Sequence, residues 1–239
     1  MNFQWLLDRK VRLPRIWSNQ ELKKFAKLFS GDVVNVSAWL DRDKQGSCYK
    51  EYFTSASNYW ITNHAEKSKG LQEGMNNQIA LDLEEDLPDE LYGRFEVVFN
   101  HTVLEHVFDC NQAFANLCHM SSDIVIVVVP FIQHQHAAYG DYWRFTPECI
   151  ERLFKINGLE LLYINFNDGS NQSIYILAIG SKQPGKWSSI SGHADNQLGR
   201  LTAKVGYRVV SQGLLFRLFN PFMLLYHKLS RASGKDQVQ

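Results

Sequence analysis

The sequence predicts an α/β protein built on a doubly wound, mostly parallel sheet that ends in an antiparallel hairpin. Residues 124–129 are six consecutive Ile and Val residues, which is typical of a central strand buried on both faces. Short apolar runs alternate with helical patterns through the first five expected strands, which indicates βαβ units. Near the C-terminal end of this region, the turn-forming residues 167–171 separate two apolar runs and predict the hairpin.

The N-terminal half supplies one helix and four strands. Ser18 and Glu21 have the spacing of a capping box, so we expect a helix to begin at Ser18 and to end before Gly31. Four short runs with apolar and β-branched residues then predict buried strands. They are residues 33–36, 59–62, 78–81 and 95–99.

The C-terminal half supplies two helices and the last three strands. Apolar spacing over residues 109–120 predicts a helix, and Pro130 is expected to end the central strand. Thr146 and Pro147 indicate the start of a second helix, because proline suits the first helical position. The hairpin strands, residues 159–166 and 174–180, bring the sheet to seven strands.

The composition excludes several classes of protein. Among 239 residues, Lys and Arg together number 25 and so do Asp and Glu, a balance that gives no sign of a nucleic-acid partner. The four cysteines are scattered, which indicates neither a zinc site nor a disulfide framework. We find no secretory signal and no apolar run of about 18 residues that would span a membrane. A cytoplasmic protein is expected, with the inner face of the membrane as an alternative location.

The chain divides into four expected segments. Residues 1–17 are a basic amphipathic segment, 18–182 a folded domain, 183–197 a polar linker and 198–239 a helical tail. No acidic residue occurs between Asp195 and Asp236, where apolar and basic residues alternate. Residues 198–231 therefore suit an anionic membrane surface. Packing against the domain or a protein partner explains the same pattern equally well.

Three motifs in order resemble those of class I S-adenosylmethionine-dependent methyltransferases. They are residues 95–107 (FEVVFNHTVLEHV), the run 129–131 (VPF), and His136 followed by residues 141–147 (DYWRFTP). The resemblance covers roughly residues 32–181 and is nearest to the type 11-like small-molecule branch, whose members often belong to glycan gene clusters. It implies a Rossmann-like fold, S-adenosylmethionine as cofactor and methyl transfer to a small hydroxylated acceptor, with a sugar or glycan precursor as our first expectation.

The cofactor motif departs from that family. Its members have a glycine-rich turn after the first strand, whereas this chain has no glycine there before Gly46. Its members also end the second strand in an acid that binds the ribose, where this chain has Asn63. The acid expected near the adenine is kept as Asp82. The resemblance assigns the cofactor to Val36, Ser37, Ala38, Trp39, Asn63, Asp82, Leu83, Asn100 and His101. The degenerate turn leaves an alternative, a catalytically inactive methyltransferase fold that serves as a scaffold or partner in glycan assembly.

The candidate catalytic residues are His136, Asp141, Arg144 and His106. The first three belong to a polar, aromatic-rich loop after the central strand, where α/β enzymes place substrate loops. His106 would act as a general base. For each site a structural role is the alternative: Asp141 and Arg144 as a salt bridge, and Glu105 with His106 as hydrogen-bonding partners of the backbone.

A metal site is the other alternative for Glu105 and His106. A Glu-x-x-Glu-His run binds a divalent ion in some quinone-pathway and RNA-terminal methyltransferases. In this chain Thr102 replaces the first Glu of that run, so we expect no metal.

Overall fold

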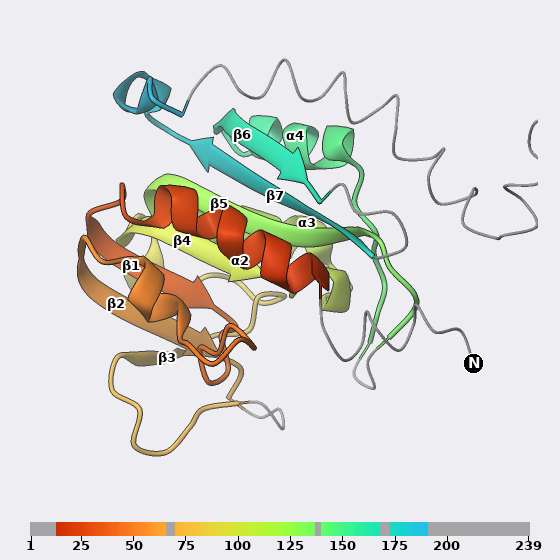
Figure 1. The fold of residues 1–239 in the computed structure, drawn as a ribbon. Coiled ribbons are helices and arrows are strands. Elements are labelled where there is room, and N and C mark those ends of the chain that lie inside the picture. The colour runs from red at the N-terminus through yellow and green to blue at the C-terminus, as the bar shows by residue number, and fades with distance from the viewer. Residues whose placement is uncertain (1–12, 66–69, 137–139, 168–172, 191–239) are drawn as a thin grey trace, which may run out of the picture.

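The computed structural model describes residues 13–65, 70–136, 140–167 and 173–190, and its centre is a seven-stranded sheet (Figure 1). The strands are β1 (Gly31–Val36), β2 (Ala56–Asn63), β3 (Gln78–Ala80), β4 (Phe95–His101), β5 (Ser121–Ile132), β6 (Glu160–Phe166) and β7 (Ile174–Ser181). Their order is β3-β2-β1-β4-β5-β7-β6, with β1 to β5 parallel and β7 antiparallel to both of its neighbours. The predicted sheet and hairpin are confirmed. Residues 1–12 and the expected tail lie outside the described residues.

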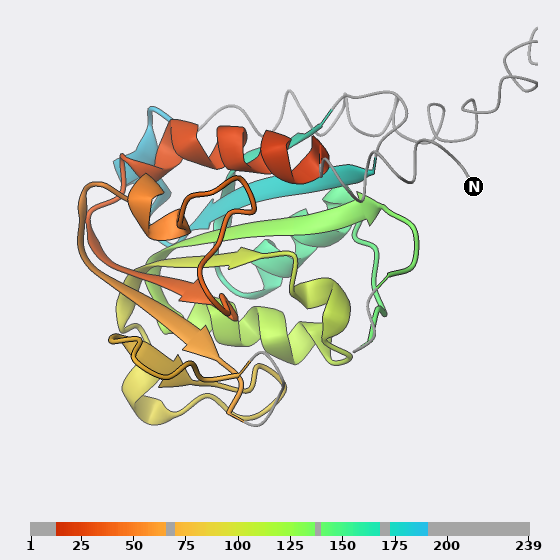
Figure 2. The same cartoon turned by 60° about the horizontal axis from the view of Figure 1, so that its bottom comes forward.

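α-Helices cover both faces of the sheet: α2 (Leu13–Ala26) packs on one face, and α3 (Cys110–Met120) and α4 (Pro147–Ile156) on the other (Figure 2). In the described links between β1, β2, β3 and β4, only short 3-10 turns occur, such as Tyr49–Tyr52. The expected regular alternation of strand and helix is therefore wrong for this half. The polar linking segments, residues 41–48 for example, offer no apolar stripe that a helix could bury.

The first helix begins earlier than predicted. α2 starts at Leu13, with Pro14 in its first turn, so Ser18 lies inside the helix and does not cap it. The Ser18 hydroxyl instead donates to the carbonyl of Arg15, as serine does within helices, and contacts the ring of His101. The capping-box interpretation is wrong, and α2 crosses the expected boundary between residues 17 and 18.

The central strand is longer than predicted. β5 continues through Pro130, which pairs with Tyr175 of β7 beside a register shift before Ile132. A bulge tolerates proline because the missing amide is not needed in the ladder there. The predicted start of α4 is confirmed: the Thr146 side chain caps the helix by accepting from the amide of Cys149.

The expected linker begins as part of the fold. Trp187 donates from its indole nitrogen to Asp123 at 3.0 Å and packs edge-on against Phe29, with the ring centroids 5.1 Å apart. Ile190 is 1% exposed in the same hydrophobic cluster as α2. Trp187 and Ile190 therefore belong to the folded domain. Within the described residues no helix is long and apolar enough to cross a membrane.

Candidate active site

The candidate site lies where β1, β4 and β5 reach their carboxyl ends. The parallel register places Val36 beside Asn100 and His101 beside Val128. The turn after β1, the 3-10 turn Leu104–His106 after β4 and the loop after β5 therefore meet at one edge of the sheet, where ligands bind in open α/β folds.

Glu105 lies at the centre of this site. Its side chain is fully buried, and neither carboxyl oxygen has a hydrogen-bond partner among the described residues. Burial raises the pKa of this carboxyl to about 8, because the charged form loses its hydration. Buried polar groups are nearly always paired, so an unpaired buried carboxyl indicates a functional group. The sequence offers Glu105 as a partner of the backbone or as a metal ligand with His106, but it does not predict this burial, which depends on a loop more than thirty residues away.

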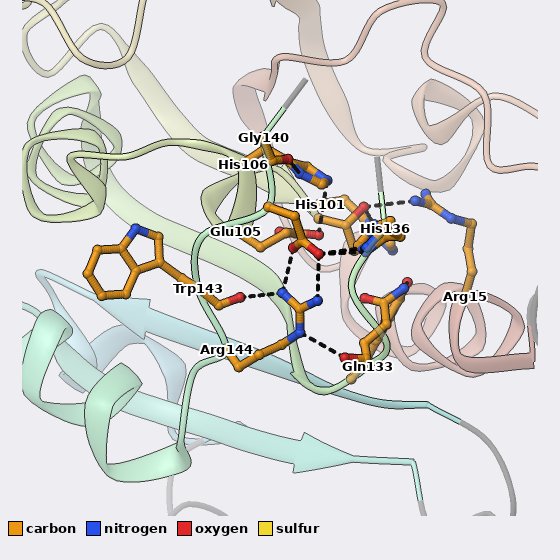
Figure 3. Close-up of polar contacts among 12 residues, drawn as sticks. Arg15, His101, Glu105, His106, Gln133, His136, Gly140, Trp143 and Arg144 are labelled. Carbon is orange, nitrogen blue, oxygen red and sulfur yellow. Dashed lines mark hydrogen bonds and ion pairs between the residues drawn. The ribbon is translucent and has the colours of Figure 1, made fainter. Parts of the chain in front are cut away.

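Backbone and ring hydrogen bonds hold that loop over Glu105 (Figure 3). The amide of Tyr142 donates to the Glu105 carbonyl at 2.7 Å. The Nδ1 of His106 lies 2.6 Å from the Gly140 carbonyl, so this nitrogen carries the proton and donates. The other ring nitrogen, Nε2, lies 3.7 Å from Glu105 Oε1 and carries no proton when the ring is neutral. His106 thus hydrogen-bonds to the backbone, which is the structural role that the sequence analysis gave as its alternative. Its second ring nitrogen lies in the site.

Asp141 and Arg144 form a clamp within the loop. Two guanidinium nitrogens donate to the two carboxylate oxygens of Asp141 at 2.6 and 2.8 Å, and the amide of His136 donates to the same carboxylate at 2.7 Å. Burial opposes ionisation of Asp141, but these hydrogen bonds outweigh it and hold its pKa at about 2. The salt bridge that was the structural alternative for Asp141 and Arg144 is therefore present, and it positions His136.

His136 completes the group that the loop brings together. Its ring lies edge-on to that of His106, with centroids 5.1 Å apart. Its Nδ1 is 3.4 Å from Asp141 but has no hydrogen-bond partner in the described part of the chain. All four predicted catalytic residues therefore gather around one residue that was not in that set, Glu105.

Arg15 is a second residue that the sequence analysis missed. It comes from α2, donates to the Tyr49 hydroxyl at 3.0 Å and to Thr102 Oγ1 at 2.8 Å, and brings a partly buried positive charge close to Glu105. The misplaced start of the helix hid it, because residues 1–17 were taken as a separate segment.

His101 belongs to the wall of the site. Its two ring nitrogens lie 2.8 Å from Ser18 Oγ and 3.2 Å from Thr102 Oγ1. Burial, and secondarily the charge of Arg15, lower its pKa well below the usual value, so the ring is neutral. His101 ties β4 to α2, and its predicted contact with the cofactor stays a prediction.

The turn after β1 keeps left-handed backbone geometry without glycine. Ser37, Trp39 and Asp41 have φ angles of 57°, 53° and 55°, values that glycine adopts most easily. These alternate positions match the spacing of a glycine-x-glycine-x-glycine turn. The turn is fastened to β2, because the amides of Ser37 and Ala38 donate to the hydroxyl and carbonyl of Thr62.

Asn63 does not offer its amide to a ligand. It is 1% exposed; its Oδ1 accepts from the Trp39 amide at 2.6 Å, and its Nδ2 donates to the carbonyl of Trp39 and to Gln78 Oε1. In this geometry Asn63 holds the turn, and its contact with a ribose stays a prediction.

The remaining cofactor candidates lie around the turn. Asp82 is paired with His64 at 2.8 Å, and Leu83 beside it is buried. Asn100 donates to the carbonyl of Val36 at 3.2 Å, whereas its Oδ1 is buried without a partner among the described residues. Asn100 therefore holds an unused acceptor beside the turn.

Comparison with known proteins identifies the fold. No family model and no curated protein matches the sequence. A magnesium protoporphyrin IX methyltransferase from Synechocystis, with bound S-adenosylmethionine, has a TM-score of 0.51 at 13% identity and covers 75% of this chain and 84% of its own. The N-methyltransferase NodS from Bradyrhizobium japonicum, with S-adenosylhomocysteine, has a TM-score of 0.50 at 14% identity and covers 75% and 92%. Such likeness shows that this chain has the class I methyltransferase fold.

Proposed function

We propose that this chain is an S-adenosylmethionine-dependent methyltransferase that acts on a small hydroxylated acceptor. The observation that carries the proposal is the buried, unpaired Glu105 beside His106 and His136 at the end of β4. A protein that only needs the fold gains nothing from an unsatisfied buried carboxyl, which costs about 1–3 kcal/mol. An enzyme that moves a proton uses such a group.

The residues fit the cofactor in part. S-adenosylmethionine, when bound, supplies a methyl group on a positively charged sulfur. The left-handed turn at Ser37 and Trp39 has the shape that lets backbone approach a nucleoside, Asn100 Oδ1 is an unused acceptor, and Asp82 lies just after β3. The acid that usually binds the ribose is missing, because position 63 is Asn. The Asn63 side chain is itself engaged by Trp39 and Gln78.

The chain's own residues would handle the acceptor proton. In the neutral ring of His106, Nε2 lies next to Glu105 and would accept a proton from an acceptor hydroxyl. Glu105, with a pKa of about 8, lies next to that nitrogen and takes up or releases a proton near neutral pH. The clamp of Asp141 and Arg144 keeps His136 and the loop over the site and limits the access of water.

A ring-shaped acceptor, such as a sugar of a glycan precursor, suits the mouth of the site. Phe108, Tyr142 and Trp143 expose 67%, 52% and 39% of their surfaces there, and the rings of the first two lie 5.3 Å apart. Aromatic faces of this kind bind the apolar faces of sugars. One solved protein of similar fold, from Burkholderia thailandensis, holds 1,6-didemethyltoxoflavin, another ring-shaped small molecule (TM-score 0.50, 13% identity).

The tail, residues 198–231, would place the enzyme near its acceptor. Its basic and apolar residues suit an anionic membrane or a protein partner. Each Lys or Arg near an anionic membrane contributes about 1 kcal/mol.

The alternative function is an inactive scaffold, and one observation favours it. The bonds between Asn63 and Trp39 close the position where a ribose would contact β2. A protein that has lost its cofactor is free to fill the site in this way.

Calorimetry separates the two functions. Titration of the full chain with S-adenosylhomocysteine should release or absorb heat, and Asp82→Ala should weaken binding at least tenfold, whereas Asp86→Ala, an exposed acid nearby, should not. Ligand at 100 times its Kd should stabilise the fold by about 2.7 kcal/mol. If neither S-adenosylhomocysteine nor S-adenosylmethionine gives heat or a thermal shift, the scaffold function holds and the enzyme is excluded.

A further inference from the structure

We propose that Glu105, His106 and His136 bind a divalent transition-metal ion of the zinc class. Each offers one donor atom, and the three atoms lie within 4.8 Å of one another. The two histidines come from different loops, so the three donor atoms come together only when the chain is folded. The metal site stands on its own geometry. Its use in catalysis rests on the proposed function: with an ion bound, Nε2 of His106 would be a ligand, and the ion would activate the acceptor hydroxyl in its place.

The donor atoms are prepared for an ion. Both oxygens of Glu105 and the Nδ1 of His136 are buried without hydrogen-bond partners among the described residues. A cation would satisfy the buried carboxylate. Donors at about 2.1 Å from a tetrahedral ion are roughly 3.4 Å apart, so the side chains would draw together slightly on binding.

The surrounding contacts resemble the outer shell of a metal site. His106 donates from Nδ1 to the Gly140 carbonyl, which leaves Nε2 as the ligand, and metal-binding histidines are usually oriented in this way. Asp141 accepts from the backbone amide of His136 and is neutralised by Arg144. The guanidinium of Arg15 is directed to Tyr49 and Thr102 and therefore does not occupy the Glu105 carboxylate.

The donor set selects the ion. Two imidazoles and one carboxylate suit zinc, cobalt, manganese or iron, whereas magnesium and calcium prefer oxygen ligands alone. Three protein ligands leave a coordination position open. An acceptor hydroxyl bound there would lose its proton to water more easily. Its oxygen would then form the bond to the methyl carbon as the bond from that carbon to sulfur breaks.

The test uses the untagged full chain, stripped with a chelator and then titrated with Co²⁺, whose visible absorption reports coordination, and with Zn²⁺ by calorimetry. We expect one ion per chain. Glu105→Gln and His136→Ala should each weaken binding at least about tenfold. His134→Ala, an exposed histidine two residues away, is the matched control and should leave binding unchanged.

A wild-type titration that shows no binding decides against the site even if a variant fails to fold. Absence of Co²⁺ and Zn²⁺ binding by the wild-type chain overturns the site, as does equal binding by folded Glu105→Gln and His136→Ala proteins. Failure of the proposed function is separate: it would appear as metal binding without any heat from S-adenosylhomocysteine. Cofactor binding without metal binding would refute the metal site and leave the proposed function standing.

Discussion

The side-chain amide of Asn63 bridges the backbone of Trp39, accepting from its amide at 2.6 Å and donating to its carbonyl at 3.1 Å. This pair closes the turn after β1 onto the end of β2. An acid at position 63, as in the resembling family, is incompatible with this arrangement, because a carboxylate would face two oxygens without a hydrogen to donate.

Asn63→Asp should therefore destabilise the protein. The change removes donors to the Trp39 carbonyl and to Gln78 Oε1, so we expect a loss of about 1–3 kcal/mol in the free energy of unfolding. Urea denaturation measures it, with Asn76→Asp at an exposed position as control. Unchanged stability in Asn63→Asp would mean that the bridge contributes nothing.

The left-handed backbone of Ser37 predicts the direction in which two substitutions change the stability. At a φ of 57°, Ser37→Gly should be neutral or stabilising by up to about 1 kcal/mol, whereas Ser37→Val should cost about 1–2 kcal/mol. The same two changes at Ser122, an exposed residue of β5, should have the opposite order, because a strand favours valine. Thermal denaturation of the four variants tests the turn; valine equal to glycine at position 37 would refute it.

The buried carboxyl of Glu105 makes stability depend on pH. Its folded pKa of about 8 lies above the usual 4.5, so the folded state holds the proton more tightly. The stabilisation is complete below about pH 4.5 and is lost as the pH rises toward 8. At about 1.4 kcal/mol per pKa unit, the loss is at most about 5 kcal/mol.

Glu105→Gln isolates this effect, because glutamine stays neutral. In metal-free buffer, the variant and the wild type should have similar stability at pH 5, and the variant should become the more stable of the two by pH 8. Denaturant unfolding at several pH values measures the difference. Parallel curves for the two proteins would show that Glu105 does not titrate in this range.

His136 and Asp141 should respond differently to alanine. Under the proposed function, His136→Ala lowers turnover at saturating cofactor at least tenfold, keeps the affinity for S-adenosylhomocysteine within a few-fold and leaves the Tm nearly unchanged. Asp141→Ala also lowers the Tm, because it removes the ion pair with Arg144 and leaves the His136 amide unpaired, at a cost of about 2–4 kcal/mol. Wild-type turnover in His136→Ala would exclude His136 from the chemistry.

Two truncations locate the end of the domain. A chain that ends after Ile190 should unfold like the full chain. One that ends after Pro184 loses the Trp187 and Ile190 contacts and should be about 4 kcal/mol less stable or fail to fold. Sedimentation with anionic vesicles then tests the tail: the full chain should bind and the chain ending at Ile190 should not. Equal vesicle binding by both would place the membrane contact elsewhere.

The sequence by itself determined the elements whose signals are local. Six Ile and Val residues predicted a strand buried on both faces, and residues 124–129 are fully buried in β5. Thr146 and Pro147 predicted the start of α4, because a cap depends on residues three apart. The hairpin of β6 and β7 followed from its turn residues in the same way.

Only the tertiary structure decided the roles of residues whose partners are distant in the chain. Ser18 and Glu21 have the spacing of a cap, yet Ser18 contacts His101 and Glu21 accepts from Tyr163 of β6. Glu105 is buried because the loop at Tyr142 folds over it. Hydrogen bonds and desolvation act between neighbours in space, so no pattern along the chain reports them. The same is true of His106 and His136, which the sequence separates by thirty residues: the fold brings one donor atom from each of them and one from Glu105 within 4.8 Å of one another.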